Sequence, residues 1–155
     1  MSSDIRLQAV TLAYPHKTLV EAFDARIPCG SRIALIGQNG IGKSSLLRVL
    51  AGVQPAYEGV VSGLSDNRIG YVPQIIVDEK YHHLSGGQRF QAMLTQALSQ
   101  WPDVLLLDEP TNHLDESNVR AFIRMLNHFT GTLIVVSHDE QILQQCVETF
   151  WFLED

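Results

Sequence analysis

The chain has 155 residues, of which 45% are apolar and 18% charged, a composition that fits one globular domain with its own core. Its formal charge of −6, from 11 basic and 17 acidic residues, counts against a stand-alone nucleic-acid binder. The N-terminus has no basic segment followed by an apolar one, and the apolar runs are far shorter than a membrane span. Cys29 and Cys146 are too far apart in sequence for a CxxC pair, which indicates reduced thiols. We therefore expect a cytoplasmic protein that does not itself insert into a membrane.

Strands and helices are expected to alternate along the chain. In chain order the pattern predicts a strand with one buried face at 5–14, an apolar strand at 32–36, a helix that ends at Gly52, short β segments at 59–64 and 68–73, a helix at 86–100, a strand at 103–108, an amphipathic helix at 116–129, a strand at 132–137, a short helix at 139–147 and a strand at 149–153. Continuously apolar strands between helices are typical of a parallel sheet covered on both faces. The β-rich early third suggests a small antiparallel sheet beside it.

A glycine-rich loop follows the second of these strands. The segment from Gly37 to Ser44, GQNGIGKS, fits the pattern G-x-x-x-x-G-K-[ST] between a buried strand and a helix. Its backbone N–H groups and the helix N-terminus suit phosphate, Lys43 suits the β- and γ-phosphates, and the Ser44 hydroxyl suits Mg²⁺. The α/β pattern is therefore predicted to be a P-loop NTPase fold, although kinases and GTPases share this loop. The candidate nucleotide-binding residues here are Gly37, Asn39, Gly40, Gly42, Lys43, Ser44 and Ser45.

Two acidic residues end the apolar strand at 103–108. Asp108, at its carboxyl end, is placed to hold Mg²⁺ beside the glycine-rich loop. Glu109 follows it, where a carboxylate can orient and deprotonate an attacking water. Acidic residues often end strands merely to meet solvent, but the upstream loop favours the catalytic interpretation.

The string Leu84-Ser85-Gly86-Gly87-Gln88 resembles the signature motif of the ATP-binding cassette (ABC) ATPases. The other motifs of that family follow in the right order over nearly the whole chain: Tyr14, the glycine-rich loop, Gln74, the signature, Asp108-Glu109, TNHLD at 111–115 and Ser137-His138-Asp139. The resemblance implies a single ABC-type ATP-binding domain over residues 1–155, with a β-rich part at about 1–73, a connector at 75–83 and the signature helix and catalytic core at 84–155.

The resemblance also implies a role for each motif residue. Tyr14 would stack on adenine, Gln74 would reach Mg²⁺ and the attacking water, and His138 would bond the γ-phosphate and help to position it against Glu109. Ser85 and Gly87 would bind the γ-phosphate of an ATP held by another ABC domain, so the expected partner is a second copy or a related domain in an ATP-dependent dimer. Asp115 would lie at the seam of that dimer.

The strings EPTNHLD and SHD look most like the soluble ABC-F class, whose members act on ribosomes, although transport ATPases carry similar strings. One feature departs from the family pattern. Family members have a helical subdomain of several dozen residues between the glutamine and the signature, whereas only residues 75–83 separate Gln74 from Leu84 here. This short spacing counts against docking onto a membrane transporter subunit.

Three functions follow from these observations. The first is an ATPase with ATP and Mg²⁺ as cofactors, working in a dimer on an ABC-F-like pattern. The second is a nucleotide-binding interaction module with little hydrolysis, because the subdomain that steers the signature is missing. The third is the ATPase subunit of a transporter. A natural minimal cassette, a shortened protein and a decayed copy are all compatible with the sequence.

Overall fold

The computed structural model describes residues 3–14, 17–38, 41–74, 83–112 and 114–153, with the backbone alone at Tyr14 and 17–20. Its elements in chain order are β1 (Ile5–Tyr14), β2 (Lys17–Ile27), β3 (Arg32–Gly37), α1 (Lys43–Leu50), β4 (Glu58–Ser62), β5 (Ile69–Val72), α2 (Gly86–Ser99), β6 (Val104–Asp108), α3 (Glu116–His128), β7 (Thr132–Val136), α4 (Glu140–Gln145) and β8 (Thr149–Leu153). In these residues no helix has the length and apolarity needed to cross a membrane.

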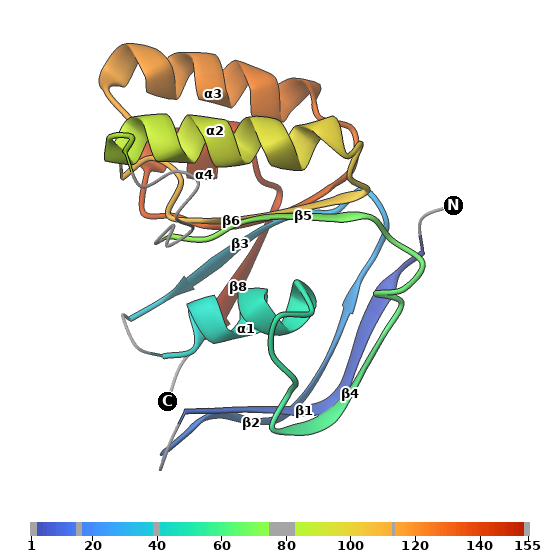
Figure 1. The fold of residues 1–155 in the computed structure, drawn as a ribbon. Coiled ribbons are helices and arrows are strands. Elements are labelled where there is room, and N and C mark those ends of the chain that lie inside the picture. Colours follow the sequence, from blue (N-terminus) through green and yellow to red (C-terminus); the bar gives the residue numbers. More distant parts are fainter. Residues whose placement is uncertain (1–2, 15–16, 39–40, 75–82, 113, 154–155) are drawn as a thin grey trace.

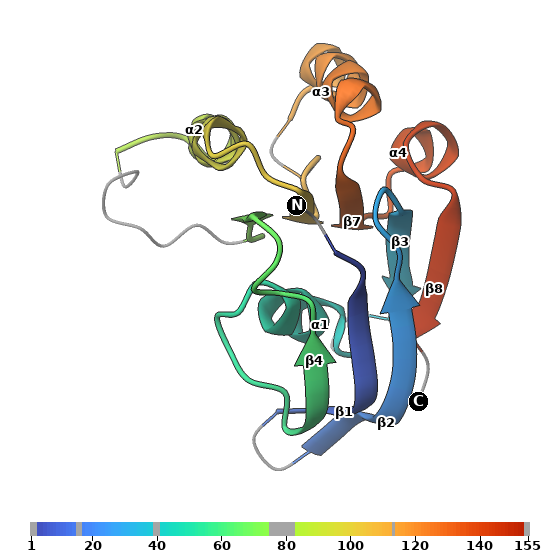
Figure 2. The ribbon, with the colours of Figure 1, turned by 90° about the vertical axis from the view of Figure 1, so that its right-hand side faces the viewer.

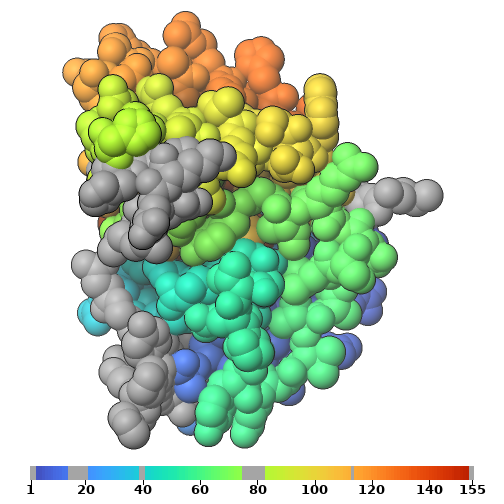
Figure 3. Space-filling view, viewed as in Figure 1, coloured from blue at the N-terminus to red at the C-terminus, as the bar shows by residue number. Residues whose placement is uncertain are grey.

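The strands form two sheets. Five parallel strands lie in the order β5-β6-β7-β3-β8, and three antiparallel strands lie in the order β2-β1-β4. Helices α2, α3 and α4 cover one face of the parallel sheet, while α1 lies between its other face and the small sheet (Figures 1 and 2). On the face drawn in Figure 3, α2 and α3 form the upper part of the surface, and α1 and β4 the lower part. This confirms the predicted parallel sheet covered on both faces and the small antiparallel sheet.

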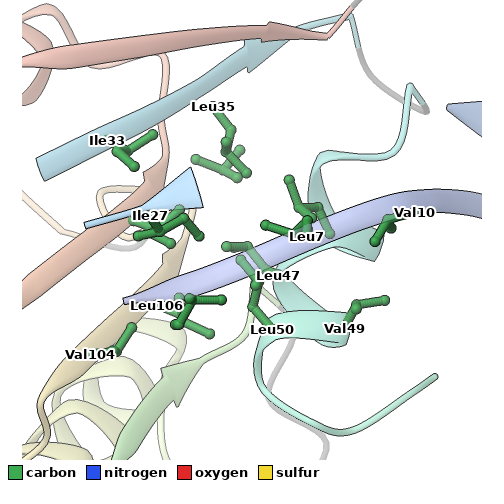
Figure 4. Close-up of a cluster of buried hydrophobic side chains, with 14 of the residues drawn as sticks. Leu7, Val10, Ile27, Ile33, Leu35, Leu47, Val49, Leu50, Val104 and Leu106 are labelled. Atoms are coloured by element: carbon green, nitrogen blue, oxygen red, sulfur yellow. The ribbon is translucent and has the colours of Figure 1, made fainter. Parts of the chain in front are cut away.

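Successive side chains of the apolar strands in the parallel sheet point alternately into two separate hydrophobic clusters. Leu106 of β6 and Ile134 of β7 point into a cluster shared with α1 and the small sheet, part of which Figure 4 shows. Leu105 and Leu133, one residue earlier in each strand, point into the cluster beneath α2, α3 and α4. Because both faces are covered, every residue of β6 and β7 is buried, which explains their uninterrupted apolar sequences.

The first helix ends where the sequence predicts. Gly52 has a φ of +77°, and its N–H donates to the Val49 carbonyl at 3.1 Å, while the Val53 N–H donates to the Arg48 carbonyl at 3.0 Å. A glycine in this left-handed conformation just past the last turn satisfies carbonyl groups that the helix leaves unpaired. Gly52 therefore turns the chain from α1 towards β4.

Two parts of the β structure differ from the sequence-based expectation. The segment Lys17–Ile27, for which we predict no element, forms β2 and pairs with β1. Its charged residues and alanines hide the signal, and its pairing with β1 is interrupted by register shifts. Of the two short predicted β segments, β4 joins the antiparallel sheet, whereas β5 joins the edge of the parallel sheet beside β6. The expected β-rich part at about 1–73 contains both segments, and nothing in their sequences assigns β5 to the parallel sheet.

A substitution at Leu106 tests the packing of the hydrophobic cluster between the two sheets. Its side chain is fully buried in the cluster shown in Figure 4, so Leu106→Ala should leave a cavity and lower the free energy of unfolding by about 2–5 kcal/mol. Val53→Ala is the control, because Val53 is 62% exposed and its truncation should cost less than about 0.5 kcal/mol. Urea unfolding followed by circular dichroism measures both, and equal losses would contradict the packing described here.

Candidate functional site

The glycine-rich loop joins the carboxyl end of β3 to the first turn of α1. Gly42 precedes the helix with a φ of +117°, a conformation that glycine adopts without strain. Gly37 ends β3 where a Cβ would lie 2.7 Å from the Leu153 carbonyl oxygen of β8, so a larger residue would push the two strands apart. Asn39 and Gly40 lie outside the described residues. Gly42 thus leads the backbone into α1 at the carboxyl edge of the sheet, where the first N–H groups of a helix lack intrahelical partners.

Lys43 is the first residue of α1, and only 6% of it is exposed. Its Nζ donates to the Gly37 carbonyl oxygen at 2.6 Å, across the loop that the two residues bracket. A buried ammonium group needs an anionic or strongly polar neighbour to offset the loss of water. Lys43 therefore places positive charge on the inside of the loop, where an anion would gain most from it.

Ser44 and Asp108 are brought together from positions 64 residues apart. The Ser44 hydroxyl donates to Asp108 Oδ2 at 2.7 Å, joining α1 to the end of β6. Asp108 is 4% exposed, and its other oxygen, Oδ1, is buried without a hydrogen-bond partner among the described residues. Burial raises the pKa of Asp108, against the Ser44 hydrogen bond and the positive charges of Arg48 and Lys43.

This pair of oxygens fits a hard divalent cation. An unpaired buried carboxylate oxygen beside a hydroxyl is costly unless a ligand completes its shell. Within the described part of the chain, no group of three or more His, Cys, Asp or Glu side chains could hold a metal by itself. Mg²⁺ suits such a site, because it commonly binds through one or two protein oxygens and takes its other ligands from water and phosphate.

Glu109 and His138 form a second pair beside the first. His138 Nε2 lies 3.3 Å from Glu109 Oε1, and the side chains are 62% and 11% exposed respectively. Burial raises the pKa of Glu109, and the Asp108 charge adds to that rise, while His138 and Lys43 oppose it. The carboxylate therefore lies largely out of water, with a solvent-facing imidazole against it.

The backbone of Glu109 is held in an uncommon conformation. Its φ is +49°, a region that a residue with a Cβ rarely adopts. The Glu109 N–H donates to the Val136 carbonyl at 2.7 Å, and the Glu109 carbonyl accepts from the Asn112 N–H at 3.3 Å. These bonds fix the turn that follows β6 and so fix the direction in which the carboxylate leaves the sheet.

The signature motif lies on the other face of the parallel sheet. Ser85 caps α2: its hydroxyl accepts from the Gln88 N–H at 3.2 Å, and the Ser85 N–H donates to the Gln88 side chain at 3.0 Å. Gly87 is in the first turn of α2. Because α1 and α2 cover opposite faces, the sheet separates Ser85 from Lys43, although both helices begin at the carboxyl edge of the strands (Figure 1).

Two other predicted site residues stand at the ends of strands. Tyr14 is the last residue of β1, and its side chain lies outside the described residues. Gln74 is exposed and follows β5, but no contact ties it to Asp108 in the described structure. The motifs also did not single out Arg48, which lies on α1 close enough to Asp108 to affect its pKa. Its only sequence signal is a position one helical turn after Ser45.

Comparison with known proteins identifies the family of the chain. A family model described as ABC transporter matches residues 20–75 and 62–112, which is more than half of the chain. The chain belongs to the ABC transporter family. The first match ends directly after Gln74.

Individual relatives place the chain near the ABC-F members of this family. It is 33% identical to the ribosome protection protein VmlR of Bacillus subtilis (strain 168), over 100% of this chain and 32% of VmlR. It is 29% identical to the human ATP-binding cassette sub-family F member 3, over 97% of this chain and 27% of that protein. The chain thus spans about a third or less of these relatives. The fold resembles a dimeric, post-hydrolysis structure of the ATP-binding cassette MJ0796 bound to ADP and Pi, with a TM-score of 0.83. The two chains are 20% identical, and the match covers 97% of this chain and 94% of that one.

The human relative also shows what this ABC domain lacks. Their alignment runs over 190 positions and covers 97% of the 155 residues of this chain, or about 150, so about 40 residues of the relative have no counterpart here. A deficit of this size is what the sequence analysis expects from the short connection between Gln74 and Leu84, which stays a prediction.

The buried Asp108 gives a testable pH dependence. Because its pKa is raised in the folded state, the folded chain holds the proton more tightly, so stability falls as the pH rises from the unfolded-state pKa through the folded one. Asp108→Asn removes the buried charge and should raise Tm at pH 7.5, without nucleotide, by about 2–4 °C. The gain should shrink as the pH approaches 4. Differential scanning calorimetry measures both, with the exposed-carboxyl variant Glu58→Gln as control, and a lower Tm for Asp108→Asn at pH 7.5 would contradict this assignment.

Proposed function

We propose that the chain is an ATPase that binds Mg-ATP at the glycine-rich loop and hydrolyses it to ADP and phosphate in a dimer that encloses two nucleotides. The observation that carries this proposal is the arrangement of two polar pairs at one edge of the sheet, Ser44 with Asp108 and Glu109 with His138. Both pairs lie where the loop and the N-terminus of α1 favour phosphate. Structural packing alone gives no reason to bury two carboxylates there.

The loop and α1 would hold the phosphates. Lys43, already inside the loop, would exchange its bond to the Gly37 carbonyl for phosphate oxygens, and the backbone of Gly37, Asn39, Gly40 and Gly42 would line the same cradle with Ser45. Ser44 and Asp108 would hold Mg²⁺, with Gln74 as a further ligand. Bound there, Mg²⁺ would neutralise charge on the phosphate oxygens. Tyr14, at the end of β1, would stack on adenine.

Glu109 would act as the base for the attacking water. The water oxygen forms a bond to the γ-phosphorus, the bond from that phosphorus to the bridging oxygen of ADP breaks, and the water proton passes to the Glu109 carboxylate. A carboxylate whose pKa is raised by burial is a stronger base than one in water, which supports this role. His138, 3.3 Å from the carboxylate and open to solvent, would bond the γ-phosphate and orient it towards the base.

The position of the signature supports a dimer. Ser85 is exposed, and the first turn of a helix such as α2 generally offers N–H groups without an intrahelical partner and a partial positive charge, which suit an anion. The parallel sheet stands between Ser85 and the glycine-rich loop of the same chain. Ser85 and Gly87 would therefore bind the γ-phosphate held by a second chain, with Asp115, the N-cap of α3, at the seam.

A rate of Mg-ATP hydrolysis per chain that rises with protein concentration is the expected signature of this mechanism. Glu109→Gln should lower the rate by about 10²-fold or more, because it removes the base and keeps the shape. A coupled phosphate-release assay over a concentration series measures both. A rate at the level of the Glu109→Gln protein at every concentration, with ATP still bound, would favour the nucleotide-binding module that the shortened connector also allows.

For the partner, we propose the ribosome, because the chain aligns almost fully with ABC-F relatives and one of these is a ribosome protection protein. Glu109→Gln with ATP should trap the bound state and pellet with ribosomes through a sucrose cushion, several-fold more than without ATP. Lys43→Ala is the matched control, since it should lose ATP and with it this enrichment. Equal pelleting of all samples, or recovery with membranes instead, would refute this partner.

A further inference from the structure

Arg48 makes two side-chain hydrogen bonds that the proposed mechanism does not use. It lies in the last turn of α1 and is half-buried. Its Nε donates to Gln54 Oε1 at 2.8 Å, beyond the end of the helix, and one terminal nitrogen donates to Ser45 Oγ at 3.1 Å, one turn earlier. The guanidinium group therefore joins the first turn of α1 to the segment that follows Gly52. Both partners are neutral acceptors, so neither neutralises the cation.

Ser45 is the acceptor that connects Arg48 to the nucleotide site. It follows Ser44 in the first turn of α1 and is 3% exposed. A hydroxyl that accepts a hydrogen bond on one side directs its own hydrogen away from that donor. Because the donor here is a cation, it also polarises the O–H bond and makes the hydroxyl a better donor to an anion.

The hydrogen bonds to Gln54 and Ser45 fix the position of the guanidinium group. From there its positive charge opposes the rise that burial causes in the pKa of Asp108 on β6 and of Tyr71 on β5. Arg48 is therefore near enough to the site to act on it electrostatically as well.

We propose that Arg48 is a positioning residue of the nucleotide site, which holds the Ser45 hydroxyl as a donor to a phosphate oxygen. This inference rests on the proposed nucleotide binding, since Ser45 otherwise has no anion to meet. Arg48 needs the geometry of arginine for this task. A lysine has one ammonium group on a flexible stem and cannot reproduce the fork that reaches Gln54 and Ser45 together.

A double-mutant cycle on nucleotide affinity tests the inference. The dissociation constant of a non-hydrolysable ATP analogue with Mg²⁺ is measured by calorimetry for the wild type, Arg48→Lys, Ser45→Ala and the double variant. Arg48→Lys should weaken binding by about fivefold, yet have little further effect once Ser45 is alanine, because the two residues act as one unit. Gln54→Ala, which frees the other end of the guanidinium, should give a smaller loss that also vanishes with Ser45→Ala.

Two controls separate this role from a structural one. Arg120→Lys, on the exposed side of α3, should change neither affinity nor Tm. Arg48→Lys keeps the positive charge at the end of α1, so its Tm without nucleotide should stay within about 2 °C of the wild type. Equal losses in the presence and absence of the Ser45 hydroxyl, or unchanged affinity in Arg48→Lys, would overturn the inference while leaving the ATPase intact. If the wild type binds the analogue no better than Lys43→Ala does, the proposed function itself fails.

Discussion

The hydrogen bond from Ser44 to Asp108 is the contact on which the arrangement of the site depends. In the parallel sheet β7 lies between β3 and β6, so α1, which follows β3, must extend past β7 to bring Ser44 against the end of β6. The apolar residues of α1 hold it there: Leu46, Leu47 and Leu50 are buried among residues of both sheets. The small antiparallel sheet therefore forms a wall over the face of α1 that points away from the parallel sheet. Without that wall, the helix would present leucines to water and could not keep its N-terminus fixed at the sheet edge.

The same edge concentrates charges that the fold would otherwise avoid. Lys43 and Asp108 are nearly buried and Glu109 is largely so, and no described bond pairs the ammonium group directly with either carboxylate. Burial opposes the charged form of both acids, which is why the pKa of each is raised. A protein can retain groups that work against its own stability when a ligand compensates for them in use. In the proposed function, polyanionic nucleotide and its cation would supply the missing charges together: phosphate for Lys43 and metal for Asp108.

Much of this was predictable from sequence, for physical reasons that differ from residue to residue. Strands β6 and β7 can be predicted because burial on two faces disfavours polar residues. Gly42, Lys43 and Ser44 can be predicted because they complete a known phosphate-binding pattern that few other residues fit. Strand β2 was not predicted because it lies at the edge of a sheet, where charged side chains are tolerated. The left-handed backbone of Glu109 and the two hydrogen bonds of the Arg48 guanidinium group were not predicted either. The Glu109 conformation depends on a distant segment, because its N–H bonds the Val136 carbonyl, and no local pattern encodes that contact. The hydrogen bonds of Arg48 are local, to Ser45 and Gln54, but no motif in the sequence marks them.

The placement of α2 bears on whether a short connector prevents catalysis. The helix is held on the core by contacts that owe nothing to residues between Gln74 and Leu84. Phe90 packs edge-to-face on Phe122 of α3, with ring centroids 5.5 Å apart. Further along, Ala97 meets Gly70 of β5, where an added Cβ would lie 3.3 Å from the alanine Cβ, so the glycine lets helix and strand approach closely. These contacts anchor the helix along most of its length, and the capping box of Ser85 and Gln88 orders its first turn from within. The order of α2 therefore does not depend on a helical subdomain, and this favours the proposed ATPase, in which the signature would face a partner's nucleotide, over a module that only binds.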